Sequence, residues 1–136
     1  MKLTLENVVG KYESSATPEI LNNIIRLTDE CNRLIRVMEA DGVVFKTNPI
    51  TGSIVSGETL GGLRPQSCPI GAPKSAHKQG MAVDIYDPDN KIDSWLASHP
   101  SIIKEYDLWF EHPTATNHWS HWSTRKPPSG RKFFLP

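Results

Sequence analysis

The sequence has few cysteines, no long hydrophobic run and no excess of charge of either sign. Lysine plus arginine number 15 and aspartate plus glutamate number 15 among 136 residues, so the formal net charge is zero. Without a net field the chain is not expected to recruit nucleic acid or an anionic membrane, although local charged patches can still form. No segment approaches the length of a membrane span, so membrane insertion is not expected either.

The two cysteines, Cys31 and Cys68, fall in no paired spacing. Cys31 lies within an apolar helical pattern, so two reduced thiols are expected rather than a structural disulfide. Cys68 lies in a proline-flanked loop with no evident helix N-terminus or cationic partner to stabilise a thiolate. A hydrolase that pairs Cys68 with a histidine is therefore disfavoured.

The first residues, MKLTLENVVGKYESS, contain no apolar run of signal-peptide length. We therefore expect synthesis in the cytoplasm without a secretion signal. If the substrate lies outside the inner membrane, another factor must deliver the protein there. The length suits one domain, residues 1–136, which we expect to be a monomer.

An apolar periodicity predicts a long N-terminal helix. Thr17 suits the N-cap and Pro18 the first turn, and apolar residues recur every three or four positions until Asp41-Gly42. The apolar face of this helix is expected to form core. A short second helix is predicted over residues 92–99, ending before Pro100.

The remaining apolar runs predict strands. These runs are residues 43–45 and 53–55, joined as a hairpin by a turn at 48–52, then a strand from Met81 through Asp84, strands at 108–110 and 119–123, and an edge strand in the tail. Residues 57–73 are dense in glycine and proline, which predicts an ordered loop or a lid over a site. The first sixteen residues are expected to form a strand or an arm. The predicted class is α+β, with a central antiparallel sheet, one long N-terminal helix and a short second helix.

Candidate metal ligands occur in the segments KSAHKQGMAVDIYD and NHWSHW. His77 and Asp84 are seven residues apart, and Gly80 allows the backbone to turn between them. Asp84 lies inside an apolar strand, where an unpaired carboxylate is costly and a cation would stabilise it. The second segment supplies His118 and His121. Two histidines and one aspartate would form an open three-ligand zinc site if the two strands are neighbours.

Strand alternation separates the two histidines of the second segment. The alternation places Trp119, His121 and Ser123 on one face of the predicted strand. His118, Ser120 and Trp122 lie on the other face. His118 and His121 are therefore not equivalent ligands unless the chain is still turning at His118.

The stretch SAHKQGMAVDI resembles the Ser-x-His-x-x-Gly-x-Ala-x-Asp signature of the zinc D-alanyl-D-alanine carboxypeptidase and endolysin peptidase group, the M15-type peptidases. The matching positions are Ser75, His77, Gly80, Ala82 and Asp84, and Trp119-Ser120-His121 resembles the group's closing Trp-x-His element. The resemblance covers residues 53 to 136 and extends to small phage-encoded members. It implies a hedgehog-like, DD-peptidase-like fold and a Zn²⁺ ion held by His77, Asp84 and His121.

The resemblance also implies roles for residues around the metal. The stretch Leu63-Arg64-Pro65-Gln66 is similar to the group's Arg-Pro element, which makes Arg64 a candidate for stabilising the oxyanion of the transition state. Ser75 and Gln66 are candidates for substrate binding.

The catalytic base departs from the pattern of the group. Many members carry Glu or Asp three residues before the last zinc ligand, and here that place is His118. A histidine, with an unperturbed pKa of about 6.5, suits the task near neutral pH. Glu111 is the other candidate, provided that the intervening loop returns it to the site. We favour His118 because it occupies the position that the group uses.

Two functions of different classes follow. The first is a zinc metallopeptidase, either a carboxypeptidase or an endopeptidase, that is encoded by a bacteriophage. It would hydrolyse peptidoglycan stem peptides in cell-wall lysis or remodelling, after delivery to the cell wall during phage lysis or from a virion. The second is a non-catalytic, zinc-stabilised binding module or virion structural module of the same fold. The missing carboxylate at position 118 favours the second function, whereas the open three-ligand set and Arg64 favour the first.

Overall fold

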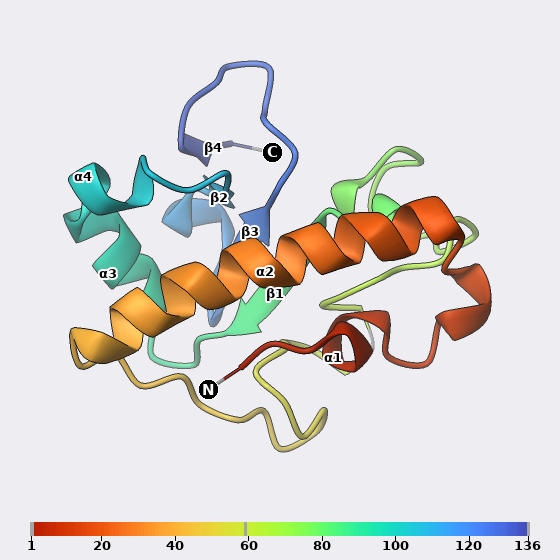
Figure 1. Cartoon of the computed structure of the whole chain (residues 1–136), viewed down its shortest axis with the longest axis horizontal. Helices are drawn as coiled ribbons and strands as arrows, with labels where there is room; N and C mark the ends of the chain where they lie inside the picture. The colour runs from red at the N-terminus through yellow and green to blue at the C-terminus, as the bar shows by residue number, and fades with distance from the viewer. Residues whose placement is uncertain (1, 59, 136) are drawn as a thin grey trace.

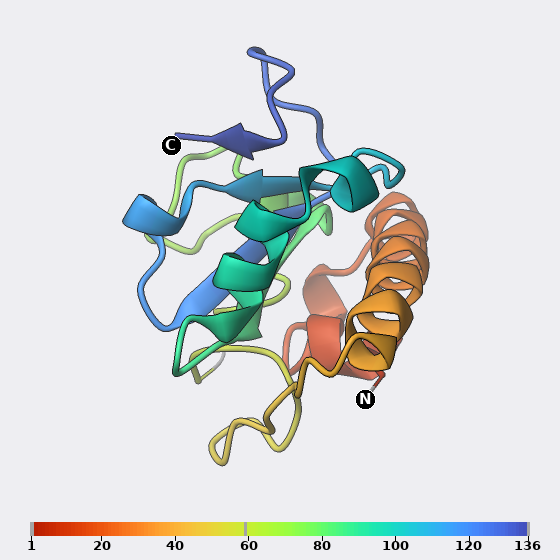
Figure 2. The ribbon, with the colours of Figure 1, turned by 90° about the vertical axis from the view of Figure 1, so that its left-hand side faces the viewer.

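The computed structural model describes residues 2–58 and 60–135. Thr59, which belongs to the predicted loop, and the two terminal residues of the predicted domain lie outside the described residues. Helix α2 (Pro18–Ala40) runs across one face of a four-stranded sheet, as Figures 1 and 2 show. The described chain is therefore α+β with one long helix near the N-terminus, as predicted.

Helix α2 forms as its caps and periodicity predict. The Thr17 hydroxyl accepts a hydrogen bond from the backbone N–H of Ile20, Pro18 occupies the first turn, and Asp41 is the C-cap. Its buried stripe consists of Ile24, Leu27, Thr28, Cys31, Leu34, Ile35 and Met38. Truncating one of the large residues to alanine would cost about 2–5 kcal/mol of stability.

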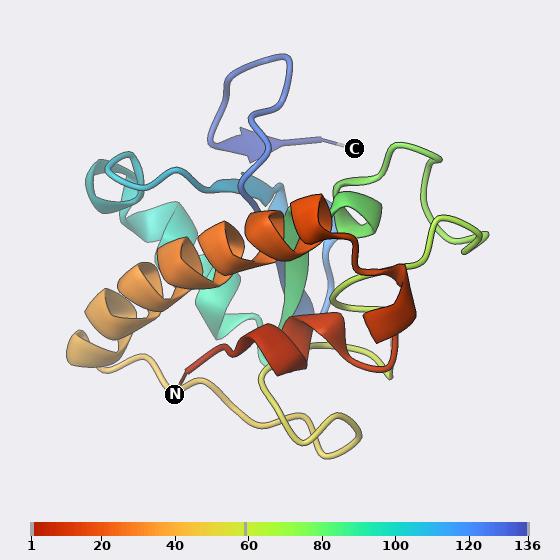
Figure 3. The same ribbon diagram turned by 45° about the vertical axis from the view of Figure 1, so that its right-hand side comes forward.

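The N-terminal segment forms helix α1 (Leu5–Val9) and a 3-10 turn, η1 (Glu13–Ser15), so the prediction of a strand or an arm is wrong. A reciprocal capping box explains α1, because Thr4 and Asn7 each bond the other's backbone N–H through their side chains. The side chain of Asn32 then bonds both the N–H and the carbonyl of Leu3, each at 2.8 Å. These bonds hold the segment against α2 (Figure 3).

The sheet has the order β1-β3-β2-β4. Its strands are β1 (Ala82–Tyr86), β2 (Trp109–Glu111), β3 (Trp119–Ser123) and β4 (Phe133–Phe134). The pairs β1·β3 and β2·β3 are antiparallel, whereas β4 pairs parallel with β2. The sheet is therefore mixed, and the prediction of an antiparallel sheet is wrong for β4, because the tail loops over and re-enters beside β2.

The register of β1 and β3 sets the position of the polar side chains. Asp84 lies directly opposite His121. Their neighbours Val83, Ile85 and Trp122 point to the other face and are fully buried against the helical layer. One strand pair therefore supplies core on one face and candidate ligands on the other.

The predicted hairpin at residues 43–55 is not formed, because the segment contains only an isolated bridge between Val55 and Ile85. The side chain of Asn48 instead closes a turn-rich loop by donating to the carbonyls of Val55 and Gly57. The backbone that follows lies along the outer edge of β1, where the N–H of Ser56 donates to the carbonyl of Asp84. The described part of residues 57–73 contains no helix or strand, as predicted.

The second predicted helix is α3 (Lys91–Ser98), begun by the carboxylate of Asp87, which accepts from the N–H groups of Ile92 and Asp93. The chain then continues into a further short helix, α4 (Pro100–Ile103), because proline suits a first helical turn.

Both cysteines are free, as predicted, with Cys31 buried in the core and Cys68 partly exposed. Burial raises the pKa of the Cys31 thiol, so this cysteine is unreactive. Within residues 2–58 and 60–135, no helix combines the length and the apolar composition that crossing a bilayer requires.

Candidate metal centre

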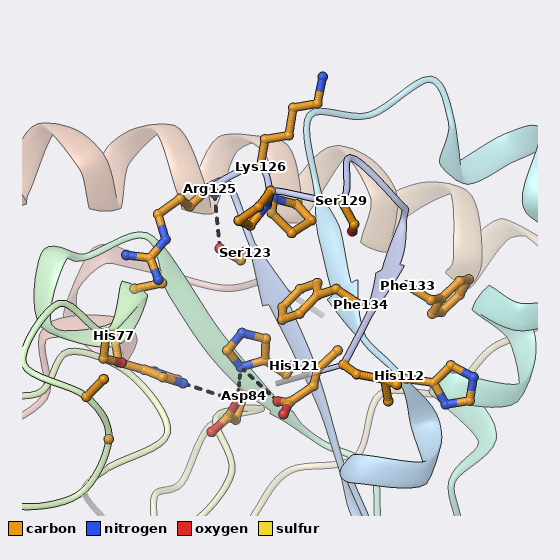
Figure 4. Close-up of a pocket in the computed structure, with 18 of the residues that line it drawn as sticks. His77, Asp84, His112, His121, Ser123, Arg125, Lys126, Ser129, Phe133 and Phe134 are labelled. Carbon is orange, nitrogen blue, oxygen red and sulfur yellow. Dashed lines mark hydrogen bonds and ion pairs between the residues drawn. The ribbon is translucent and has the colours of Figure 1, made fainter.

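Three largely buried side chains converge on the face of the β1·β3 pair that points away from the helical layer. The Nε2 atom of His77 lies 3.4 Å from Oδ1 of Asp84, and Nδ1 of His121 lies 2.8 Å from the same oxygen. One donor atom from each residue lies within 4.8 Å of the other two (Figure 4). The structure therefore brings together the three residues that the resemblance implied as ligands, close enough to hold one metal ion.

His77 reaches the cluster from the 3-10 turn η2 (Ala76–Gln79), which Gly80 ends in the left-handed region at φ 71°. A Cβ atom at Gly80 would lie 2.8 Å from the carbonyl oxygen of Ile20 and 2.8 Å from Cγ1 of Ile24. Glycine is therefore required both by the turn and by its close approach to α2. This role of Gly80 is the turn predicted from the sequence.

The proton on His77 is positioned by the backbone. Its Nδ1 lies 3.0 Å from the carbonyl oxygen of Gly62, which can only accept, so Nδ1 carries the hydrogen and donates it. In the neutral ring the lone pair is then on Nε2 and faces the carboxylate of Asp84. A proton on Nε2 or a metal ion can lie between these two atoms, which are 3.4 Å apart, and a metal-binding histidine in proteins is oriented by this type of carbonyl contact.

Asp84 is ionised at the centre of this cluster. Burial raises its pKa, but His77 and His121 together outweigh that effect, and the pKa of Asp84 falls well below its usual range. The Nη2 atom of Arg64 lies 3.6 Å from the second carboxylate oxygen. A buried carboxylate that is charged and shared in this way is a suitable metal ligand.

Arg64, the candidate for stabilising the oxyanion, lies on the cavity wall. Its side chain is 13% exposed, and its Nε donates to the carbonyl of Leu60 at 2.7 Å. Ser75 also lines the cavity. Gln66 does not line it, because its amide donates to the carbonyl of Pro73 and closes the neighbouring loop instead.

Glu111 is brought to the centre by β2. Its Oε2 lies 3.8 Å from Nδ1 of His121, and its side chain is 18% exposed. Burial, helped by the negative charge of Asp84, raises the pKa of Glu111, while His121, His77 and Arg64 partly offset the rise. Of the two predicted bases, Glu111 is the one that the fold places beside the ligands.

His118 lies away from the cluster, so the prediction that its ring approaches the metal centre is wrong. Strand β3 begins at Trp119, as predicted, and the residue before it, His118, has a left-handed backbone with φ 77°. Its ring Nδ1 lies 3.0 Å from the carbonyl oxygen of Pro88, and its backbone N–H donates to Asn90. These contacts hold an exposed ring at the turn that precedes α3.

The cluster lies in a cavity of about 1080 Å³. Besides the ligands, the lining includes Arg64, Ser75, Glu111, His112, Trp119, Ser123, Arg125, Lys126, Arg131, Phe133 and Phe134. The ring of Phe134 packs edge-on against His121, with centroids 5.9 Å apart. The contribution of the tail to this cavity was missed, although the basic turn and the apolar end of the tail were visible in the sequence.

No relative of the chain was found: no family model, no curated protein and no solved structure matches it. The function of the cluster must therefore be argued from its geometry and from the motif. The geometry supplies the ligand set, and the motif supplies the reaction that such a set would serve.

Proposed function

We propose that the chain is a zinc-dependent peptidase that hydrolyses a peptide bond in peptidoglycan stem peptides, on a hedgehog-like, DD-peptidase-like scaffold. The observation that carries the proposal is the convergence of donor atoms from His77, Asp84 and His121, with Nε2 of His77 facing the Asp84 carboxylate at 3.4 Å. One donor atom from each of the three residues lies within 4.8 Å of the other two, so the set could share one metal ion.

The donor set fits zinc better than the harder cations. Two imidazole nitrogens and one carboxylate oxygen are typical ligands of catalytic zinc, which keeps a further position open. Calcium and magnesium prefer sites made only of oxygen atoms. The hydrogen bond from His77 to Gly62 supplies the outer contact that usually accompanies a zinc-binding histidine.

Zinc, when bound, would polarise a substrate carbonyl and lower the pKa of water. The neighbouring side chains would supply the remaining functions of a peptidase. The carboxylate of Glu111 would accept the proton of the attacking water, since it lies next to His121 on the neighbouring strand. The guanidinium of Arg64 would stabilise negative charge that develops on the carbonyl oxygen.

The substrate class is supported by the cavity and by the motif. A volume of about 1080 Å³ is at the upper end of the range for small-molecule sites, which suits a peptide of several residues. Ser75, which matches the signature, lines this cavity and can hydrogen-bond a peptide backbone. The likeness of Ser75-to-Asp84 to the peptidase signature directs the proposal toward wall peptides.

The alternative is a non-catalytic, zinc-stabilised binding or virion module. It is favoured by one observation: the position that peptidases of this type use for the base is occupied by His118, whose ring is bonded to Pro88 instead. The alternative therefore depends on whether Glu111 takes over the role of the base.

The decisive experiment measures zinc and hydrolysis in the same samples. We expect one zinc per chain by mass spectrometry and hydrolysis of purified peptidoglycan that stops with chelator and returns with added zinc. Glu111→Gln should keep the zinc and lose most of the hydrolysis, whereas the matched variant His118→Ala should keep both. Bound zinc without hydrolysis by the parent protein would establish the binding module instead.

A further inference from the structure

Charge is segregated in the cavity although the whole chain is neutral. The positively charged residues that line it are Arg64, Arg125, Lys126 and Arg131. The negatively charged ones are Asp84 and Glu111. Both acids belong to the metal centre. The rest of the wall is therefore cationic, and a cation at the centre would add to that field.

Three of these cations, Arg125, Lys126 and Arg131, lie on the β3–β4 loop, defined here as residues 124–132. Figures 1 and 2 show this loop projecting beyond the sheet. In Figure 4 the side chain of Lys126 extends away from His121, toward the outside. Because the ligands and this loop line the same cavity, one ligand could contact both.

Two cations of the loop have no partner in the described structure. Arg125 is engaged, since it donates to the carbonyl of Lys74 at 2.6 Å and to Gln79 at 3.3 Å. For Lys126 and Arg131, no ion pair or side-chain hydrogen bond to any residue in 2–58 or 60–135 is present, and both are exposed. Their charges are therefore available to a ligand.

The loop that presents these two charges is ordered by its own bonds. The N–H of Gly130 donates to the carbonyl of Pro127 at 2.9 Å, and the N–H of Arg131 donates to the hydroxyl of Ser129 at 3.3 Å. Pro127 and the following Pro128 restrict the backbone further and also line the cavity. A loop held in this way loses little entropy when it binds a ligand.

We infer that the β3–β4 loop recognises a carboxylate of the substrate, so that the cavity selects acidic peptides. The inference rests on the proposed function and names its substrate class. The peptide backbone lies at His77, Asp84 and His121, while a carboxylate further along the peptide meets Lys126 and Arg131. A guanidinium pairs with a carboxylate through two parallel hydrogen bonds, and the ammonium adds a point charge.

The test measures binding, so that it does not depend on turnover. The probe is a fluorescein-labelled synthetic peptide that contains two glutamates, compared by anisotropy with the same peptide carrying glutamines. The double variant Lys126→Gln, Arg131→Gln should bind the acidic peptide about three- to tenfold more weakly, the scale for two exposed ion pairs, and the glutamine peptide unchanged. Added salt should weaken only the acidic complex.

The matched control is the double variant Arg36→Gln, Lys104→Gln. It also removes one arginine and one lysine, but from exposed sites that do not line the cavity. It should bind both peptides as the parent does. Zinc content and melting temperature should be unchanged in both double variants. Acidic peptides with free and amidated C-termini distinguish recognition of a terminal carboxylate from recognition of a side chain.

Equal weakening of both peptides, equal weakening by the control variant, or no weakening at all would overturn the inference. Displacement of the acidic peptide by an oligonucleotide at lower concentration would overturn it in favour of a nucleic-acid ligand. Failure of the proposed function has a different signature, namely no hydrolysis of any peptide by zinc-loaded protein. The anisotropy measurement still tests the loop in that case.

Discussion

The two faces of the β1·β3 pair differ in what holds their side chains in place. On the helix-facing side, Val83, Ile85 and Trp122 are fully buried among apolar neighbours. On the cavity side, Asp84 and His121 alternate with them and are held by mutual polar contacts. A single backbone register thus separates a face stabilised by apolar packing from a face whose polar side chains lie close enough to hold a metal ion, and the two can be perturbed independently.

The largest expected effect is on the cavity face. Asp84→Ala removes the carboxylate common to both histidines, so stoichiometric zinc should be lost. Because metal-binding free energy is also folding free energy, chelator should lower the melting temperature of the parent but not of this variant. Mass spectrometry and thermal melts check both outcomes.

The matched control for that variant is Asp89→Ala, which removes an exposed acid that pairs with Lys46. It should keep the zinc and the response to chelator. A full zinc equivalent in Asp84→Ala would remove the proposed site.

The next effect is on the core face. Trp122→Ala removes a fully buried ring that packs edge-on against Phe45 and Phe110, and it should lower the free energy of unfolding by about 3–5 kcal/mol. Trp119→Ala, on the cavity face of the same strand, should cost much less. Urea denaturation measures both, and equal losses would contradict the separation of the two faces.

The smallest of the three effects concerns Arg64 on the cavity wall. Arg64→Ala should lower turnover by about a hundredfold, the scale for losing one donor to a developing oxyanion, with the zinc content intact. The exposed Arg33→Ala variant is the control. Unchanged turnover would rule out the catalytic role, and lost zinc would show that the contact of Arg64 with Asp84 is needed to hold the ligands.

The elements that could be predicted from the sequence are those whose causes are local. Helix α2 follows from Thr17, Pro18 and a regular apolar stripe, and β3 begins and ends where it was expected. The parallel pairing of β4 could not be predicted, because it depends on where a distant segment returns to the sheet. The capping box of α1 was overlooked, since Thr4 and Asn7 lie in a short segment with no strong periodicity.

The candidate site divides in the same way. The spacing of His77 and Asp84 predicted two ligands on one segment, and the resemblance to the peptidase signature selected His121 as the third; these three do meet. The position of His118 could not be predicted, because the left-handed backbone of this non-glycine residue depends on its contacts with Pro88 and Asn90. Glu111 needed the pairing of β2 with β3, which is a long-range property.

The contact between Gly80 and the start of α2 ties two layers of the molecule together. The side chain of Asn23 also donates to the carbonyl of Gln79 at 2.9 Å, so the first turns of the helix touch the η2 turn at two points. Helix α2 therefore helps to position His77 and does not only pack against the sheet. A change in the tilt of α2 would move the η2 turn and with it the side chain of His77. The sequence at the start of α2 is therefore constrained for as long as the three-residue cluster is retained.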